Sequence, residues 1–400
     1  MEWKEVRLGD VCEIKHGFAY KGKYFSDTPT CDILVTPGNF TLSGGFKLDK
    51  PKFYNGPVEK DYILSKGDLI VTMTDLSKNI DTLGYSALVP EVKGLTFHHN
   101  QRIGLVENIA NNVDKYFLYW IMRTPAYQSF IATHSSGTTV HHTSPKGIGN
   151  YVFKLPPLDD QRRIASILST LDRKIELNNK INADLEEMAQ AIFKNWFVDF
   201  EPFKDGKFVD SELGMIPEGW KVGGIFDIAE IFDKKRKPLS GNVREKMDKI
   251  YPYYGATSCM DYVDDYIFDG IYTLIGEDGS VVKENGLPYM QYVWGKMWVN
   301  NHAHILQGKN GYSTEMIHAL LSITNIKFLV TGAVQAKLSQ GNMQKILVAI
   351  PPKNVLDEIR PVIDNLYSKI RINTDENSRL SLLRDTLLPR LMSGELEVPE

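Results

Sequence analysis

The sequence lacks the features of a membrane or secreted protein. Its 400 residues include only three cysteines, which are too scattered for a disulfide framework or a cysteine-based metal site: Cys12, Cys31 and Cys259. No apolar run is long enough to span a bilayer, and the start, "MEWKEVRLGD", lacks the basic and then apolar pattern of a signal peptide. These absences predict a cytoplasmic protein.

An excess of basic charge is also missing, which taken alone argues against a nucleic-acid binder. The formal net charge is −4 and the isoelectric point is near 6.2. Residues 1–155 hold 17 Lys and Arg against 15 Asp and Glu, and residues 219–350 hold 14 against 13. The negative excess therefore lies outside these two regions, whose near-neutral charge permits DNA binding without indicating it.

Motifs for catalysis are absent as well. The sequence contains no phosphate-binding G-x-x-x-x-G-K-[ST] loop, no G-x-G-x-x-G dinucleotide turn and no G-x-S-x-G nucleophile elbow. It also lacks the Asn-Pro-Pro-aromatic motif with which amino-methyltransferases hold a target amine. Among its nine histidines, the pairs at 98–99, 141–142 and 302/304 have no carboxylate or cysteine at a recognised spacing, so we predict no metal site.

What the sequence does contain is an internal duplication. Residues 2–14 match residues 219–231 at an offset of 217, and residues 153–164 match 347–359 at an offset of 195. The second offset also aligns two loop positions, Gly137 with Gly332 and Lys146 with Gly341. Each repeat is therefore predicted to be a globular region followed by a long helix.

Both long helices are predicted to follow a Pro-Pro pair, because proline disfavours helix before it. In the first helix, apolar residues recur at alternating steps of four and three from Ile164 to Trp196, which is the heptad pattern of a coiled coil. This helix is expected to end near Phe200, and its counterpart is expected to break near Pro389 and the "SGELEVPE" tail (393–400).

The globular regions combine both kinds of secondary structure. Residues 66–73 and 269–276 have the pattern of buried strands, and residues 113–131 and 314–324 that of helices. The predicted fold class is α+β, with two globular domains separated by two long helices.

Two asparagines interrupt the apolar seam of each helix, at equivalent positions. They are Asn178 and Asn182 in the first helix and Asn373 and Asn377 in the second. A polar residue in such a seam weakens the coil but fixes its register. In an antiparallel pair Asn178 would face Asn377 and Asn182 would face Asn373. In a parallel pair equivalent positions would face each other, Asn178 with Asn373 and Asn182 with Asn377. We expect the antiparallel arrangement, with the globular regions at opposite ends of a rod and related by a pseudo-twofold axis.

Loops rich in amide and basic residues occur in both globular regions. Such side chains suit hydrogen bonds to base edges and phosphates, although for any one loop taken alone a solvated turn is the commoner explanation. The candidate DNA-binding residues of the first region are Asn100, Gln101, Arg102, Thr139, His141 and Lys146. Those of the second are Lys235, Arg236, Asn301, Gln335, Lys337, Gln340 and Asn342.

Five stretches together resemble the specificity subunit of type I DNA restriction–modification systems. They are "PPLDDQRRI" (156–164), "NWFVDFEPF" (195–203), "SELGMIPEGW" (211–220), "TGAVQAKLSQGN" (331–342) and "LLRDTLLPRLMSGELEV" (382–398). The resemblance covers both repeats. One departure is that the first region has "VHHTSPKGIG" where the second keeps "QAKLSQGN".

The resemblance implies two target-recognition domains, each reading half of a split DNA sequence, with coiled-coil helices as the ruler between them. It also implies docking of two methyltransferase (modification) subunits and of a restriction subunit. S-adenosylmethionine, ATP and Mg are then expected on those partners, with no cofactor in this chain. The subunit itself is expected to be non-catalytic.

The resulting domain prediction has five parts. They are a first target-recognition domain (1–155), a first coiled-coil helix (156–200), a linker (201–218), a second recognition domain (219–350) and a second helix with its tail (351–400). The rival interpretation is a coiled-coil scaffold that joins two protein-binding modules, which near-neutral charge would suit. A hydrolase is the weakest alternative, because no nucleophile–base pair or metal set is visible in the sequence.

Overall fold

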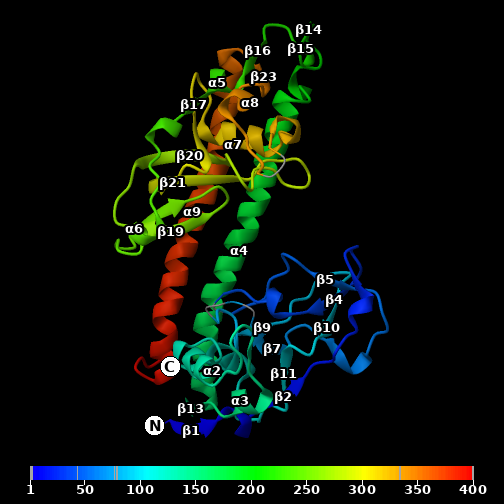
Figure 1. Ribbon diagram of the computed structural model, residues 1–400, viewed down its shortest axis with the longest axis vertical. Coiled ribbons are helices and arrows are strands. Elements are labelled where there is room, and N and C mark those ends of the chain that lie inside the picture. The colour runs from blue at the N-terminus through cyan, green and yellow to red at the C-terminus, as the bar shows by residue number, and fades with distance from the viewer. Residues whose placement is uncertain (1–2, 43, 76, 78–79, 333–334, 399–400) are drawn as a thin grey trace. The chain divides into compact units, whose positions relative to one another are not determined.

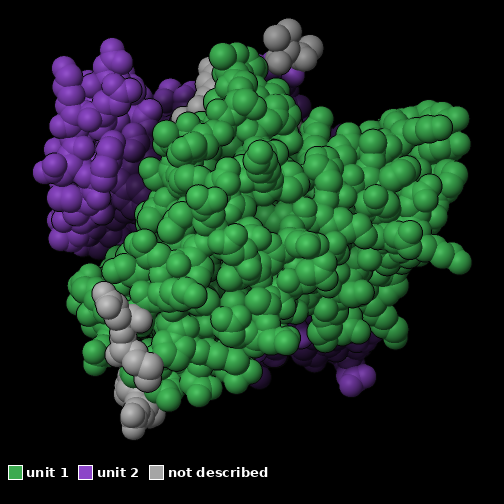
Figure 2. Space-filling model, turned by 90° about the horizontal axis from the view of Figure 1, so that it is seen from below, with its two compact units in different colours: residues 1–176, 377–400 green, residues 177–376 purple. Residues whose placement is uncertain are grey.

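A computed structural model describes residues 3–42, 44–75, 77, 80–332 and 335–398 of the chain (Figure 1). The chain divides into two compact units: unit 1 comprises residues 1–176 and 377–400, and unit 2 comprises residues 177–376 (Figure 2). Helix α4 (Leu158–Phe197) and helix α9 (Lys353–Ser393) each contribute one part to unit 1 and the other to unit 2. Each unit therefore consists of a globular α+β region and a pair of helix segments.

The two long helices begin after the Pro-Pro pairs, as predicted, and α9 runs past Pro389 to the start of the predicted tail. It continues to Ser393 and stops before Gly394, whose φ of +78° lies in the left-handed region that glycine favours. A proline inside a helix removes one backbone hydrogen bond. Here Leu388, Leu391 and Met392 are buried in the core of unit 1, and this packing keeps the last turn helical.

Unit 1 contains two main sheets and two short strand pairs. The sheets have the orders β3-β5-β4-β10-β6 and β2-β11-β7-β9, and the pairs are β1-β13 and β12-β8. The strands are β1 (Lys4–Arg7), β2 (Glu13–His16), β3 (Phe25–Ser26), β4 (Asp32–Val35), β5 (Lys52–Tyr54), β6 (Ile63–Leu64), β7 (Leu69–Thr72), β8 (Thr74–Asp75), β9 (Ser86–Leu88), β10 (Thr96–His99), β11 (Ile103–Glu107), β12 (His141–His142) and β13 (Val152–Leu155).

The helices of unit 1 correct one prediction. Residues 113–131 form two helices, α1 (Lys115–Ile121) and α2 (Pro125–Thr133), in place of the single helix expected. Proline disfavours helix at the residue before it, so Thr124 is extended, and its hydroxyl accepts a hydrogen bond from the Tyr127 amide as the N-cap of α2. Helix α3 (Pro145–Gly149) follows.

Unit 2 is built around one six-stranded sheet of order β17-β22-β20-β21-β18-β19, with two further strand pairs, β16-β23 and β14-β15. Its strands are β14 (Phe208–Ser211), β15 (Gly214–Pro217), β16 (Lys221–Gly224), β17 (Ala229–Ile231), β18 (Tyr251–Tyr254), β19 (Cys259–Val263), β20 (Phe268–Gly276), β21 (Met290–Val299), β22 (Ala303–Gly308) and β23 (Leu347–Ile350). Its short helices are α5 (Ile225–Ile228), α6 (Gly241–Arg244), α7 (Thr314–Ser322) and α8 (Gln340–Met343).

Within each unit the two helix segments run antiparallel. In unit 1, Asp172 of α4 accepts a hydrogen bond from Arg384 of α9 at 2.6 Å, and Ile164 and Leu168 share a core with Leu388. In unit 2, Asn178 contacts Glu376, whereas Asn182 contacts residues earlier in α9. Residue numbers thus rise along one helix as they fall along the other, which confirms the antiparallel pairing.

No helix in the described part of the chain has a segment long and apolar enough to cross a bilayer.

Candidate nucleic-acid interface

The predicted loops meet at the end of one strand in each unit, through the same backbone hydrogen bonds. In unit 1 the Met73 amide donates to the Arg102 carbonyl, and the Met73 carbonyl accepts from the Thr143 amide. In unit 2 the Glu277 amide donates to the His302 carbonyl, and the Glu277 carbonyl accepts from the Leu338 amide. Each unit therefore presents two of its predicted loops side by side, and the duplication extends to the backbone of the candidate site.

A tight hairpin is the first element of this shared site. Ser136 and His142 exchange two backbone hydrogen bonds in unit 1, and Thr331 and Lys337 do so in unit 2. Gly137 and Gly332 have φ values of +100° and +97°, and a Cβ at either position would lie about 2 Å from a backbone carbonyl oxygen. Glycine is required there, which explains its recurrence at the 195 offset.

A helical turn follows each hairpin. The hydroxyl groups of Ser144 and Ser339 cap α3 and α8 by accepting backbone hydrogen bonds at 3.0 and 3.1 Å. Lys146 and Gly341 lie within these turns, in agreement with their alignment in the sequence.

An asparagine-centred turn is the third shared element. The side-chain oxygen of Asn100 accepts a hydrogen bond from the Arg102 amide, and that of Asn300 accepts one from the His302 amide. Both asparagines are buried. The sequence analysis missed Asn300, although the pattern of an asparagine followed by an amide residue recurs at 100–101 and 300–301.

The candidate residues of unit 1 differ in how far their side chains are available. Arg102, Thr139 and Lys146 are exposed, and Gln101 is half-buried. The side chain of Asn100 is committed to its turn, and that of His141, in strand β12, is half-buried. The structure thus leaves three freely exposed candidates in this unit.

In unit 2 several candidates join one buried polar network around Asp233. Its carboxylate accepts hydrogen bonds from His304 Nδ1 at 2.5 Å, Gln340 Nε2 at 2.7 Å and the Ile305 amide at 3.0 Å. The Arg236 guanidinium lies 3.3 Å from the same carboxylate. The network connects the loops 233–241, 298–304 and 331–342, which the sequence analysis had treated separately.

Arg236 is fully engaged in this network. It donates to Glu277 at 2.6 Å and to the Ala303 carbonyl at 2.7 Å, and its side chain is only 12% exposed. Burial alone would raise the pKa of Asp233, but the His304 hydrogen bond and the charges of His304 and Arg236 hold that pKa below its ordinary value.

The spacing of Asp233, Glu277 and His304 would allow a metal ion, since one ligand atom from each lies within 4.8 Å of the others. Yet His304 Nε2 lies 2.6 Å from the Leu338 carbonyl, which can only accept a hydrogen bond, and Nδ1 faces the Asp233 carboxylate. Both ring nitrogens therefore act as donors, and the Arg236 guanidinium supplies positive charge to the two carboxylates. This arrangement is that of a structural ion-pair network.

The remaining candidates of unit 2 are more exposed. Lys235, Asn301 and Gln335 face solvent, whereas Lys337 lies 3.4 Å from Glu277 and keeps about half of its side chain exposed. Asn342 donates to the Leu329 carbonyl at 2.9 Å and is half-buried.

The seam asparagines of unit 2 bond across the helix pair. Asn373 Nδ2 donates to Asn182 Oδ1 at 2.9 Å, and Asn182 Nδ2 donates to the Thr374 hydroxyl at 3.1 Å. Asn178 Nδ2 donates to Glu376 at 2.8 Å, beside Asn377 in sequence. Asn178 and Asn373 are each 1% exposed, so these amides lie in the interior of the seam.

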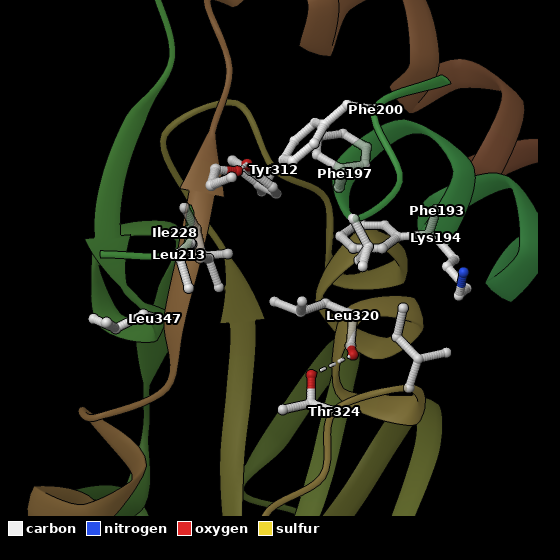
Figure 3. A pocket seen from close by; sticks show the side chains of 14 residues that line it. Phe193, Lys194, Phe197, Phe200, Leu213, Ile228, Tyr312, Leu320, Thr324 and Leu347 are labelled. Atoms are coloured by element: carbon white, nitrogen blue, oxygen red, sulfur yellow. Dashed lines mark hydrogen bonds between the residues drawn. The ribbon is translucent and has the colours of Figure 1, made fainter. Parts of the chain in front are cut away.

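An apolar cavity of about 280 Å³ lies in unit 2 at the end of α4 (Figure 3). Phe193, Phe197 and Tyr312 line it, and the exposed residues Leu213 and Leu347 stand at its edge. The polar groups in its lining are already engaged, since the Thr324 hydroxyl donates to the Leu320 carbonyl at 2.7 Å and Lys194 pairs with Asp199. Its chemistry suits contact with apolar side chains.

Comparison with known families identifies the scaffold. Residues 1–187 and 217–382 match the family described as "Type I restriction modification DNA specificity domain". The chain belongs to this family.

Individual relatives agree with this assignment. The chain is 27% identical to the type I restriction enzyme MjaIX specificity subunit of Methanocaldococcus jannaschii, over 71% of this chain and 69% of that protein. It is 24% identical to the type I restriction enzyme HindI specificity subunit of Haemophilus influenzae, over 99% of this chain and 100% of that protein. The crystal structure of the type I restriction-modification system S subunit from M. genitalium has a similar fold. Its TM-score is 0.58 at 16% identity, covering 98% of this chain and 96% of that one.

Proposed function

We propose that this DNA-specificity protein reads a split, asymmetric DNA target, with the loop cluster of each unit recognising one part. The observation that carries the proposal is that one backbone cluster, built on Met73 in unit 1 and Glu277 in unit 2, occurs twice with different side chains. Two copies of one scaffold that carry different reading residues suit a target with two different halves.

The exposed candidates are the ones we assign to direct DNA contact, since they have side chains free to reach base edges or phosphates. They are Arg102, Thr139, Lys146, Lys235, Asn301 and Gln335. Asn100, Arg236, Gln340 and Asn342 are assigned a positioning role, because their side chains already bond within their unit. Gln101 and His141 are half-buried and Lys337 lies 3.4 Å from Glu277, and all three stay candidates for either role.

The helix pair is proposed to set the spacing between the two parts of the target and to dock two methyltransferase subunits. The seam amides support the first role, because buried polar pairs oppose slippage of one helix along the other. The apolar cavity at the end of α4 supports the second, because exposed Leu213 and Leu347 beside it offer apolar area to a protein partner.

Catalysis is assigned to the partners. S-adenosylmethionine would be held by the methyltransferase subunits, and ATP and Mg by a restriction subunit. The sequence of this chain contains none of the motifs searched for that bind phosphate or a target amine.

The experiment that tests this proposal is co-expression with the methyltransferase subunit of the same system in a host that lacks adenine methylation. Genome-wide sequencing of methyladenine should then reveal one motif, made of two short specific parts around a fixed unspecific gap. A soluble complex that produces no new methylation would refute the proposal and favour a coiled-coil scaffold.

A further inference from the structure

A cationic pair on unit 1 points to a binding site that the loop residues alone did not suggest. Lys52 lies in β5 and Arg102 lies in the turn after β10, so the two are 50 positions apart in the sequence. The sheet register connects them: Lys52 pairs with Leu34 of β4, which in turn pairs with His98 of β10. Both side chains are exposed. Lys52 lies on β5, two strands away from β10, which leads into the turn that holds Arg102.

An aromatic ring holds Lys52 in place. Its ammonium group lies 3.8 Å from the centroid of the Phe25 ring, close enough for a cation–π interaction. Phe25 belongs to β3, the neighbour of β5, and is itself 40% exposed. The ammonium group is therefore positioned on the surface without being neutralised.

Neither cation has an acidic partner. Within the described ranges no ion pair involves Lys52 or Arg102, whereas some exposed lysines of unit 1 are paired, as Lys66 is with Glu91 at 2.6 Å. Partial burial lowers the pKa of Lys52, and the nearby charge of Arg102 lowers it further. Like charges repel each other, and an anion bound beside them would relieve that repulsion.

The equivalent turn in unit 2 shows the contrast. His302 occupies the position of Arg102, and its Nδ1 lies 2.5 Å from Asp278. The position of Asp278 is taken in unit 1 by Thr74, whose hydroxyl lies 3.1 Å from His142 Nδ1. In unit 2 the Asp278 carboxylate thus contacts the side chain of His302 at this turn. In unit 1 the neutral Thr74 takes the place of Asp278, which leaves Arg102 available to an external anion.

We propose that Lys52 and Arg102 bind the sugar–phosphate backbone of DNA beside the part of the target read by unit 1. This inference rests on the proposed DNA-recognition function and adds a residue, Lys52, and a role to it. Both residues neutralise phosphates and carry no sequence information. The proposal therefore assigns Arg102, so far a candidate for contact with either base edges or phosphates, to the phosphates.

The test measures how DNA affinity depends on salt, using the full chain in its methyltransferase complex. The variants are Lys52→Gln and Arg102→Gln, and the matched control is Lys66→Gln, which removes the same charge from a lysine that already has a partner. One probe is a duplex that carries the motif identified by methyladenine sequencing. The other is a duplex of equal length in which that motif is scrambled.

Each lost phosphate contact should reduce the slope of log affinity against log salt by about 0.9. When salt is raised from 50 to 200 mM, the factor by which affinity falls should then be roughly three- to fourfold smaller for each variant than for the wild type. The change should be equal on the two duplexes, absent in Lys66→Gln, and reversed by the charge-preserving variants Lys52→Arg and Arg102→Lys.

Slopes that match the Lys66→Gln control would overturn the inference, and so would a loss confined to the motif duplex. Failure of the proposed function gives a different result, because the wild type would then bind both duplexes equally. Thermal unfolding of each variant shows whether it folds as the wild type does.

Discussion

At the scale of single residues, the two units differ most in how they hold their loops together. Unit 2 connects three loops through the buried carboxylate of Asp233, whereas the corresponding segment of unit 1 begins with His16 and Gly17 and carries no such carboxylate. Gly17 instead allows close backbone approach, since a Cβ there would lie 2.1 Å from the Asn100 carbonyl oxygen. The same loop arrangement is thus held by charge in one unit and by close packing in the other.

Asp233→Asn should destabilise the protein in a pH-dependent way. The pKa of Asp233 is lower in the folded protein than in the unfolded chain, so its contribution is present above the unfolded pKa of about 4 and is lost as the pH falls through the lowered value. At pH 7 the variant should be less stable by about 3–5 kcal/mol, because His304 and Arg236 lose one of the two carboxylates that face them and keep only Glu277. Urea unfolding at several pH values measures this difference.

The control for this prediction is Asp264→Asn, which changes an exposed aspartate of the same unit. It should leave the free energy of unfolding within about 0.5 kcal/mol of the wild type. A stability gap for Asp233→Asn that stays constant from pH 7 to pH 3 would show that the charge of Asp233 is not what stabilises the loops.

Gly332→Ala should distort the hairpin of unit 2. At φ +97° a side chain is strained, and its Cβ would lie 2.1 Å from the Gln335 carbonyl oxygen. We expect a loss of about 1–3 kcal/mol in unfolding free energy together with weaker DNA binding. Gly341→Ala is the matched control, because Gly341 lies in α8 with open space around its Cβ position, and alanine there should be neutral or stabilising. Equal thermal unfolding curves for the two variants would contradict this account.

At the scale of elements, much of the fold could be predicted because its signals are local and repeated. The heptad pattern and the Pro-Pro pairs predicted both long helices, and the constant offset of 195 aligned Gly137 with Gly332 before any geometry was known. Pro389 itself does not end α9, because the burial of Leu391 and Met392 outweighs the hydrogen bond that proline removes, and the helix ends where the predicted tail begins.

The candidate site was less predictable because its residues converge only in three dimensions. Lys52 has no neighbouring motif, and its proximity to Arg102 depends on the register of β5, β4 and β10. In the same way, the sequence cannot show that Arg236 and Gln340 bond to Asp233 and are therefore less available to DNA.

The paired seam amides give a prediction at this scale. Asn373→Leu alone should cost about 1–3 kcal/mol, since the half-buried Asn182 loses the donor that lies 2.9 Å from its side-chain oxygen. The double variant Asn182→Leu/Asn373→Leu should recover or exceed wild-type stability, because no amide is then left unpaired. Chemical unfolding of the four members of this cycle gives the coupling free energy. Additive losses in the double variant would mean that the two amides act independently.

The same seam tests register control. Replacing Asn178, Asn182, Asn373 and Asn377 with leucine should raise stability while it permits other registers or oligomers, because leucine–leucine contacts tolerate slippage that amide pairs oppose. Size-exclusion chromatography and methylation activity report the outcome. A quadruple variant that remains one species and fully active would show that the asparagines do not fix the register.

At the scale of the whole molecule, the proposed ruler function makes the length of the helix pair a determinant of the DNA target. Each heptad adds seven residues at 1.5 Å per residue, or about 10 Å of helix, while DNA rises 3.4 Å per base pair. Inserting one heptad into both α4 and α9 near the seam asparagines should therefore lengthen the unspecific gap by up to about three base pairs. The two specific parts should stay unchanged, since the loop clusters on Met73 and Glu277 are untouched. Methyladenine sequencing of the variant reads the new motif directly.

The control insertion places the heptad in α4 alone. The two helices would then differ by one heptad, so Asn182 could not face Asn373 while Asp172 faces Arg384. The antiparallel contacts on one side of the insertion would be lost. This variant should abolish methylation, whereas the paired insertion should preserve it with a longer gap. If the paired insertion instead methylates the original motif, the helices do not set the spacing. If it changes the specific bases, the helix pair influences reading as well as distance.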